Sequence, residues 1–160
     1  MNSTANQNIG TTGNFPVEFV DICPYDDSCF AEKMSKMVKD PGFEHAIRFT
    51  MPDIDFDAFV AKLLAVKNQK DFQERIMGEF LEMLFARTTA GLSLGGKTNI
   101  NPSRSYTFIS NHRDIVLDAA FLNLCFIQNH IPLTQIAIGN NLLIYDWITD
   151  LVKLNRSFVV

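Results

Sequence analysis

The chain has 160 residues, of which 47% are hydrophobic and 20% are charged, a length and composition typical of one globular domain with a real core. Its formal net charge of −4 argues against a broad basic surface of the kind that holds a nucleic-acid backbone, so no nucleic-acid partner is expected. The sequence has no apolar run of about eighteen residues and no basic segment leading into one, so we expect neither a transmembrane helix nor a secretory signal.

The first half of the chain is predicted to be helical after a polar start. Residues 1–14 contain almost nothing apolar and are predicted to form a disordered tail, and residues 15–24 are predicted to be extended. Four helices are predicted next. The first covers 27–38 behind a cap at 26–28, and a short one covers 43–49 after a break at 40–42. Two more cover 56–67 and 71–87, where apolar side chains recur at three- and four-residue steps. Residues 15–90 are therefore predicted to be an N-terminal helical region.

The second half, residues 91–160, alternates between short apolar runs and helical patterns. It begins with a glycine-rich strand or turn over 91–96. The elements predicted after it are a strand at 106–109, a helix at 116–129, a strand at 135–138, a helix at 144–154 and a strand at 157–160. This order predicts an α/β fold with parallel strands and right-handed crossovers, in which ligands gather at the carboxyl ends of the strands.

A polar cluster stands between the first of these strands and the helix that follows it. His112 is close in sequence to two carboxylates, Asp114 and Asp118. Histidine takes and returns a proton near neutral pH, and a carboxylate can fix its tautomer and activate a hydroxyl nucleophile. The alternative is that the cluster only begins a helix, with Asn111 or Asp114 as the cap and with His112 and Arg113 on the surface.

The stretch from Asn111 to Asp118 resembles the first motif of the glycerolipid acyltransferases, the superfamily of glycerol-3-phosphate and 1-acylglycerol-3-phosphate acyltransferases. That motif is written N-H-R-S-x-x-D, with the aspartate five positions after the histidine. Here Leu117 takes the fifth position, and the aspartates stand two and six positions on. The variant is similar to a bacterial branch with long N-terminal helices. Asp118 is the favoured partner of the histidine, because one extra residue in the turn could restore its reach, and Asp114 is the alternative.

The resemblance implies an enzyme that transfers an acyl group from acyl-CoA or an acyl-carrier protein to glycerol phosphate or a lysophospholipid, without a cofactor. It makes His112 the general base and an aspartate its partner. Arg113 would meet a phosphate, or else has a packing role. Gly139 and Asn140 follow the next strand and would line the acceptor pocket, or else only form a turn.

The last residues, Asn155–Val160, resemble a second family motif, G-x-x-F-I-x-R, whose arginine would fall just after Val160. Arg156 does not stand at the arginine position of this motif, so we assign it no role. The third motif, F-P-E-G, and the fourth, a proline segment, are absent. The resemblance therefore implies the N-terminal portion of an acyltransferase domain, and without the missing motifs the 160-residue form is expected to be inactive.

Residues Gly91–Thr98 match the phosphate-loop pattern G-x-x-x-x-G-K-[ST]. A true phosphate loop follows a buried strand and opens a helix. Here a helix is predicted before the pattern, and Pro102 follows it closely, so nucleotide binding is the weakest of the hypotheses and a glycine-rich turn is favoured. A further alternative makes the helical half, residues 27–87, an accessory module that docks on a membrane or a partner.

Three cysteines, Cys23, Cys29 and Cys125, form no metal-ligand spacing, and no metal is expected. Cys125 lies in an apolar helix and is predicted to be a small buried hydrophobe. Free cysteines favour a reducing compartment, so the predicted location is cytoplasmic, with peripheral contact at the inner face of the membrane.

Overall fold

The structure is a computed structural model. It describes residues 11–12, 15–16, 19–101, 103–111 and 113–160. The predicted tail therefore lies outside the described residues, apart from Thr11–Thr12, and so does His112.

The chain divides into two compact units. Unit 1 comprises Met1–Gln69 and Ala137–Val160, and unit 2 comprises Lys70–Ile136. Each unit is described by itself. The domain boundary near residue 90 stays a prediction.

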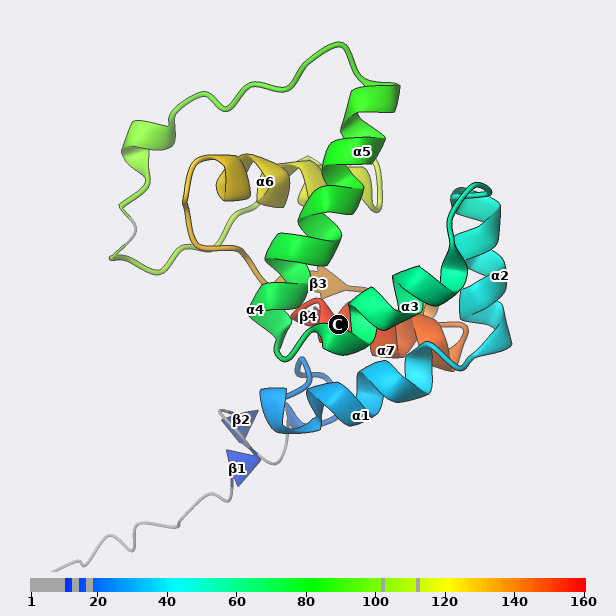
Figure 1. Cartoon of the computed structure of the whole chain (residues 1–160). Coiled ribbons are helices and arrows are strands. Elements are labelled where there is room, and N and C mark those ends of the chain that lie inside the picture. The colour runs from blue at the N-terminus through cyan, green and yellow to red at the C-terminus, as the bar shows by residue number, and fades with distance from the viewer. Residues whose placement is uncertain (1–10, 13–14, 17–18, 102, 112) are drawn as a thin grey trace, which may run out of the picture. The chain divides into compact units, whose positions relative to one another are not determined.

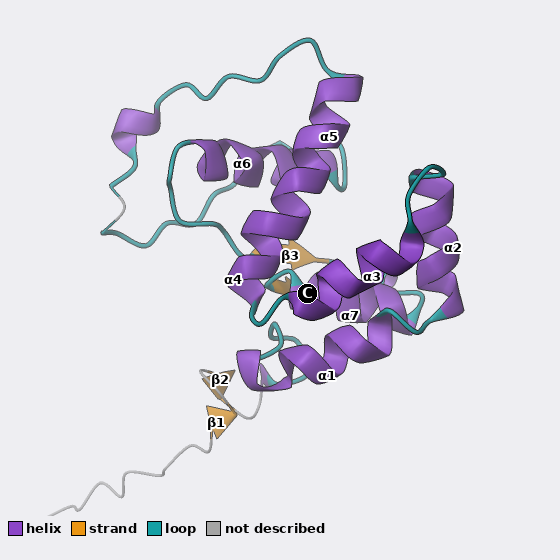
Figure 2. Ribbon diagram, viewed as in Figure 1, coloured by secondary structure: helices purple, strands orange, loops and turns teal. Residues whose placement is uncertain are grey.

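The first three helices are drawn in purple with the others in Figure 2. All three begin behind an aspartate whose carboxylate accepts a hydrogen bond from an amide of the first turn. These aspartates are Asp26 before α1 (Asp27–Met37), Asp40 before α2 (Pro41–Thr50) and Asp55 before α3 (Phe56–Ala65). All three predicted helices are confirmed. The second begins two residues earlier than expected, because Asp40 caps it and a proline suits the first helical position.

Unit 1 is built around α1, which contacts both α3 and α7 (Asp146–Leu154) (Figure 1). The core side chains of these helices are almost fully buried: Phe30, Met34, Met37, Leu63 and Leu154. The three- and four-residue steps predict that Phe56, Phe59, Val60, Leu63 and Leu64 share one buried face of α3. Phe56 and Leu63 are buried, whereas Leu64 is 45% exposed.

A two-stranded parallel sheet joins β3 (Ile136–Ile138) to β4 (Ser157–Val159), with α7 as the connection. The Val160 amide donates to the Ile138 carbonyl at 2.9 Å, and the Asn140 amide donates to the Val160 carbonyl at 3.0 Å. In parallel strands, the backbone of one residue forms hydrogen bonds to two residues of the neighbouring strand that are two positions apart. The predicted strand–helix–strand unit at the end of the chain is therefore confirmed, and the fold is helix-rich with a small parallel sheet.

The segment predicted to be extended over 15–24 is only partly so. Phe15–Pro16 (β2) pairs antiparallel with Thr11–Thr12 (β1). Residues 19–23 form a turn instead, in which the Cys23 amide donates to the Phe19 carbonyl at 2.9 Å. This turn lies beside the sheet, because the Val159 amide donates to the Ile22 carbonyl at 2.8 Å.

Unit 2 contains the predicted helix over 71–87, with an irregularity that the sequence pattern did not predict. Its turns run from α4 (Gln69–Asp71) through a π-helical stretch, Phe72–Met77, into α5 (Gly78–Thr88). The next helix, α6 (Leu117–Gln128), confirms the prediction for 116–129 and packs against α5. The rings of Phe85 and Phe121 meet edge to face at 6.0 Å.

The strand predicted over residues 106–109 is wrong, because the segment pairs with no other strand among the described residues. A strand needs backbone partners on a neighbour. Here the aromatic side chains make the contacts, and the Phe108 ring lies 5.3 Å from that of Phe126 on α6. Residues 91–96 likewise form no strand and have an irregular conformation. Among the described residues, none of the helices combines the length and the apolar character that crossing a bilayer requires.

Candidate functional site

The candidate site is the loop that leads into α6. Its two aspartates accept hydrogen bonds from different backbone amides. Asp114 points forward along the chain. Its Oδ1 accepts hydrogen bonds from the amides of Val116 at 2.9 Å and Leu117 at 2.8 Å. Bonds to amides two and three residues on are those of a helix N-cap. Asp114 therefore stabilises the first turn of α6.

Asp118 points backward onto the loop. Its Oδ2 accepts the Arg113 amide at 2.7 Å and the Asp114 amide at 3.0 Å. The residue itself belongs to the first turn of α6 and is half-buried. Two amide bonds to one carboxylate oxygen hold the side chain against the backbone that follows position 112.

The remaining predicted site residues divide between the two units. Arg113 is exposed beside the aspartates in unit 2, and no ion pair to it is found in the described part of the chain. Gly139 and Asn140 belong to unit 1, where they follow β3 as expected. The Leu142 amide donates to the Gly139 carbonyl at 3.0 Å, so this pair forms a turn. His112 lies outside the described residues.

The glycine-rich segment lacks the setting of a phosphate loop. Helix α5 precedes it, and only a three-residue 3₁₀ turn, Lys97–Asn99, follows Gly96. Gly96 has a φ of 71°, a left-handed conformation that glycine adopts without strain. The Lys97 ammonium donates to the side chain of Asn129 at 3.0 Å. The predicted helix before this pattern is confirmed, and among the described residues between the pattern and α6 no helix longer than this turn is found.

A polar cluster in unit 1 was missed by the sequence analysis. The Tyr25 hydroxyl donates to Asp150 Oδ1 at 2.5 Å, and Lys36 Nζ lies 3.4 Å from Asp150 Oδ2. Asp150 is only 2% exposed. The available sequence signal was weak: Asp150 precedes the apolar pair Leu151–Val152, but other polar residues also occur in 144–154.

The charges of this cluster shift two pKa values. Burial raises the pKa of the Tyr25 hydroxyl well above its usual range, and the bond to Asp150 adds to the shift. The negative charge of Asp150 is the main cause that raises the pKa of Lys36. Lys153 Nζ donates to the Asp21 carbonyl at 2.6 Å. These contacts tie α1 and the segment before it to α7, which is a structural role.

Cys125 is 6% exposed, which confirms the prediction of a buried cysteine, and burial raises the pKa of its thiol. Across the described ranges, no group of three His, Cys, Asp or Glu side chains is placed to hold a metal ion. Comparison with protein-family models, with characterised proteins and with solved structures finds no match to the chain.

Proposed function

We propose that the chain is the N-terminal portion of a glycerolipid acyltransferase, which moves an acyl group from an acyl thioester to a hydroxyl of glycerol phosphate or a lysophosphatidic acid. The Asn-His-Arg motif supports the proposal by resemblance. The observation that carries it is the backward turn of Asp118, whose carboxylate is held at the backbone directly after His112.

In the proposed reaction His112 takes the proton from the acceptor hydroxyl, and the oxygen attacks the carbonyl carbon of the thioester. The carbon–sulfur bond then breaks, and the thiolate leaves with the proton that the histidine returns. The products are an ester and a free thiol. No metal or redox group is needed to balance this step.

Asp118 is the proposed partner that orients the imidazole and offsets its positive charge. Asp114 is less suited, because its Oδ1 is directed forward to the amides at the start of α6 and not back to the backbone that follows position 112. Arg113 is exposed and is the proposed contact for the acceptor phosphate.

The test is an acyl-transfer assay on the full-length protein. With labelled acyl-CoA and glycerol phosphate or a lysophosphatidic acid, His112→Ala should lower kcat about a hundred- to ten-thousand-fold. His45→Ala is the matched control, because His45 is exposed on α2. A wild-type protein without acyl transfer, or full activity in His112→Ala, would refute the proposal.

A further inference from the structure

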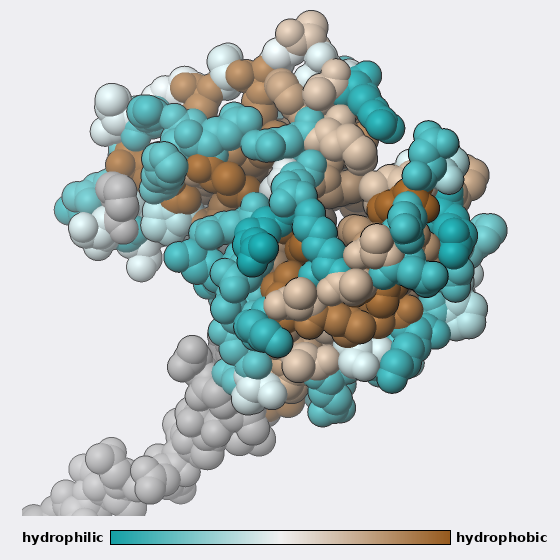
Figure 3. All heavy atoms as spheres, viewed as in Figure 1, coloured by the Kyte–Doolittle hydropathy of each residue, from teal (hydrophilic) through white to brown (hydrophobic). Residues whose placement is uncertain are grey.

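Apolar side chains are exposed at two separate places in the chain, and the first is the loop before α6 in unit 2. Ile109 is 92% exposed, Val116 66% and Ile115 60%, and the Phe108 ring is 42% exposed although it contacts α6. Exposed apolar side chains that are neighbours in sequence indicate an interaction surface, whereas scattered ones do not. In Figure 3 hydrophobic side chains reach the surface in the part of the molecule that contains α6. We call five residues the loop surface: Arg104, Phe108, Ile109, Ile115 and Val116.

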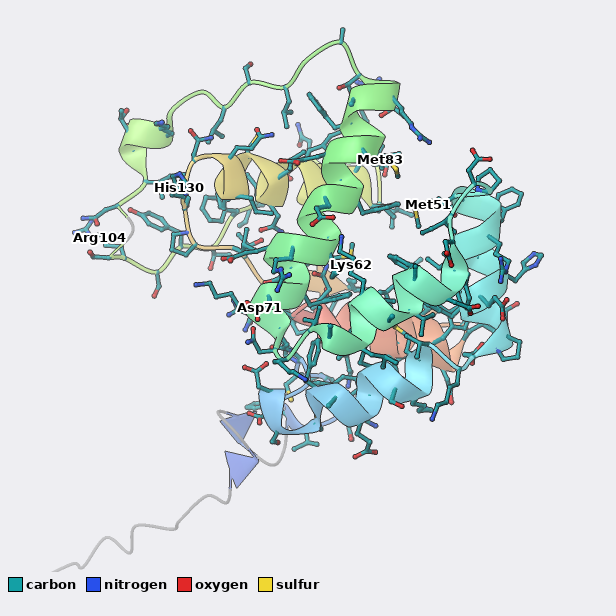
Figure 4. All side chains as sticks on the ribbon, in the orientation of Figure 1. Met51, Lys62, Asp71, Met83, Arg104 and His130 are labelled. Atoms are coloured by element: carbon teal, nitrogen blue, oxygen red, sulfur yellow. The ribbon has the colours of Figure 1, made fainter. Side chains whose placement is uncertain are left out.

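The loop surface belongs to a positively charged part of the chain. Residues 89–116 contain three basic side chains and one acidic one, which gives +2, although the whole chain carries −4. The one acidic residue, Asp114, directs its carboxylate to the amides that begin α6. Arg104 is exposed and has no ion-pair partner among the described residues. Figure 4 shows Arg104 at the outer edge of the long loop before α6.

The second place is the connection between α2 and α3 in unit 1. Phe49, in the last turn of α2, is 83% exposed. Its neighbour Arg48 is paired with Glu44 at 2.8 Å and lies over the Phe56 ring at 4.9 Å, so this arginine brings no unpaired charge to the connection. Figure 4 labels Met51, which ends α2 where the connection begins. An aromatic ring exposed to this degree has no packing role within its own helix.

The charge around Phe49 is opposite to that of the loop surface. Residues 49–57 contain three acidic side chains and no basic one, which gives −3. Asp55 caps α3 by accepting the Ala58 amide at 3.0 Å. Asp53 and Asp57 are exposed, and no ion pair to either is found in the described part of the chain. We call three residues the tip surface: Phe49, Asp53 and Asp57.

We propose that the loop surface of one copy of the chain binds the tip surface of a second copy. Burial of Ile109 and its neighbours against Phe49 removes apolar area from water, and Arg104 and the aspartates supply opposite charges around this contact. Because the two surfaces differ, the contact is head to tail, and each bound copy keeps one surface for a further copy. The inference goes beyond the proposed function and does not depend on it.

Contacts of either surface with itself are less favourable. In a two-fold dimer through the loop surface, Arg104 would approach its own copy across an apolar contact, and burying like charges without partners is costly. A two-fold dimer through the tip surface would place Asp53 and Asp57 opposite the same carboxylates. The mixed contact alone brings the +2 region against the −3 region, so charge complementarity selects a second copy bound head to tail.

The test is sedimentation velocity of the full chain from about 1 µM to about 1 mM. We expect association that increases with concentration and continues beyond a dimer, because every copy carries both surfaces. High salt should weaken it, since exposed opposite charges are screened.

Two double variants separate the surfaces. Arg104→Gln with Ile109→Ser changes the loop surface, and Phe49→Ser with Asp53→Asn changes the tip surface. Each double variant by itself should associate at least about tenfold more weakly than the wild type. An equimolar mixture of the two should form a dimer and nothing larger, because each retains the surface that the other lacks. All four side chains are exposed, so the fold should persist, which circular dichroism checks.

The control variant changes the same kinds of side chain outside both surfaces. Ile144→Ser with Lys67→Gln removes an apolar side chain that is 69% exposed and an exposed cation. This variant should associate like the wild type.

Four results would overturn the proposal. The first is a wild type that stays monomeric over the whole range of concentration. The second is a tip-surface variant that still dimerises while the loop-surface variant does not, because the loop surface would then bind itself. The third is a mixture of the two variants that stays monomeric. The fourth is a control variant that associates as weakly as the other two.

Discussion

Asp114 and Asp118 stand four residues apart, and the direction of each side chain decides what it can do. Asp114 bonds to the amides ahead of it, and Asp118 bonds to those behind it. The sequence motif could identify His112 and offer both aspartates as partners. It favoured Asp118 only on the assumption of one extra residue in the turn, because counting positions does not show how the turn between Arg113 and Leu117 closes.

The capping role of Asp114 can be tested by stability. Asp114→Ala leaves the Val116 and Leu117 amides without this acceptor, so the free energy of unfolding should fall by about 1 kcal/mol. Asp114→Ser keeps a capping oxygen and should recover most of the loss. Urea denaturation followed by circular dichroism measures both. Equal stability of the wild type and Asp114→Ala would contradict the assigned role.

The Tyr25 hydroxyl gives a pH dependence with a definite sign. Its pKa is raised in the folded protein, whereas in the unfolded chain it loses its proton near the ordinary pKa of about 10. The stability that Tyr25 contributes is therefore complete below about pH 10 and is lost as the pH rises further, through the folded pKa. Because Tyr25 is only half-buried, solvent moderates the size of the effect.

Tyr25→Phe should remove this part of the pH dependence. The free energy of unfolding of the wild type should fall more steeply above about pH 10 than that of Tyr25→Phe, as measured by urea denaturation at a series of pH values. Parallel curves for the two proteins would show that Tyr25 does not keep its proton through the contact with Asp150.

At the scale of elements, local rules explain which predictions succeeded. Aspartate caps and three- and four-residue apolar steps are local signals, and the helices they predicted are present. The strand over 106–109 was predicted from apolar character alone. A strand also needs a neighbour, and the aromatic contacts with α6 took the place of pairing. The π-helical stretch Phe72–Met77 has no sequence signal that we recognise.

Gly78 allows α5 and α6 to approach closely. A Cβ built on it would lie 3.3 Å from Ile127 Cδ1, so the larger Gly78→Val should force the helices apart and lower the free energy of unfolding by about 1–3 kcal/mol. Gly91→Val is the control, because a Cβ there meets nothing within 4 Å. Urea denaturation compares them. An equal effect of the two changes would exclude a packing role for Gly78.

For the whole molecule, the sequence predicted the parallel strand–helix–strand unit at the end of the chain, because its alternation of patterns is strong. The division into two compact units was not predicted. It depends on contacts between residues far apart in sequence, such as the Gln69 amide group with the Lys153 carbonyl at 3.0 Å. Periodicity within single elements carries no information about such contacts.

The central claim is that His112 and Asp118 act as one unit in acyl transfer. A double-mutant cycle on kcat/KM tests it most directly, with His112→Ala, Asp118→Asn and the two combined, and with Asp114→Asn as the matched carboxylate control. We expect Asp118→Asn to cost less than His112→Ala but far more than Asp114→Asn, and the double variant to be no worse than His112→Ala alone. Losses that multiply in the double variant, or an Asp118→Asn enzyme with wild-type kcat/KM, would contradict the account.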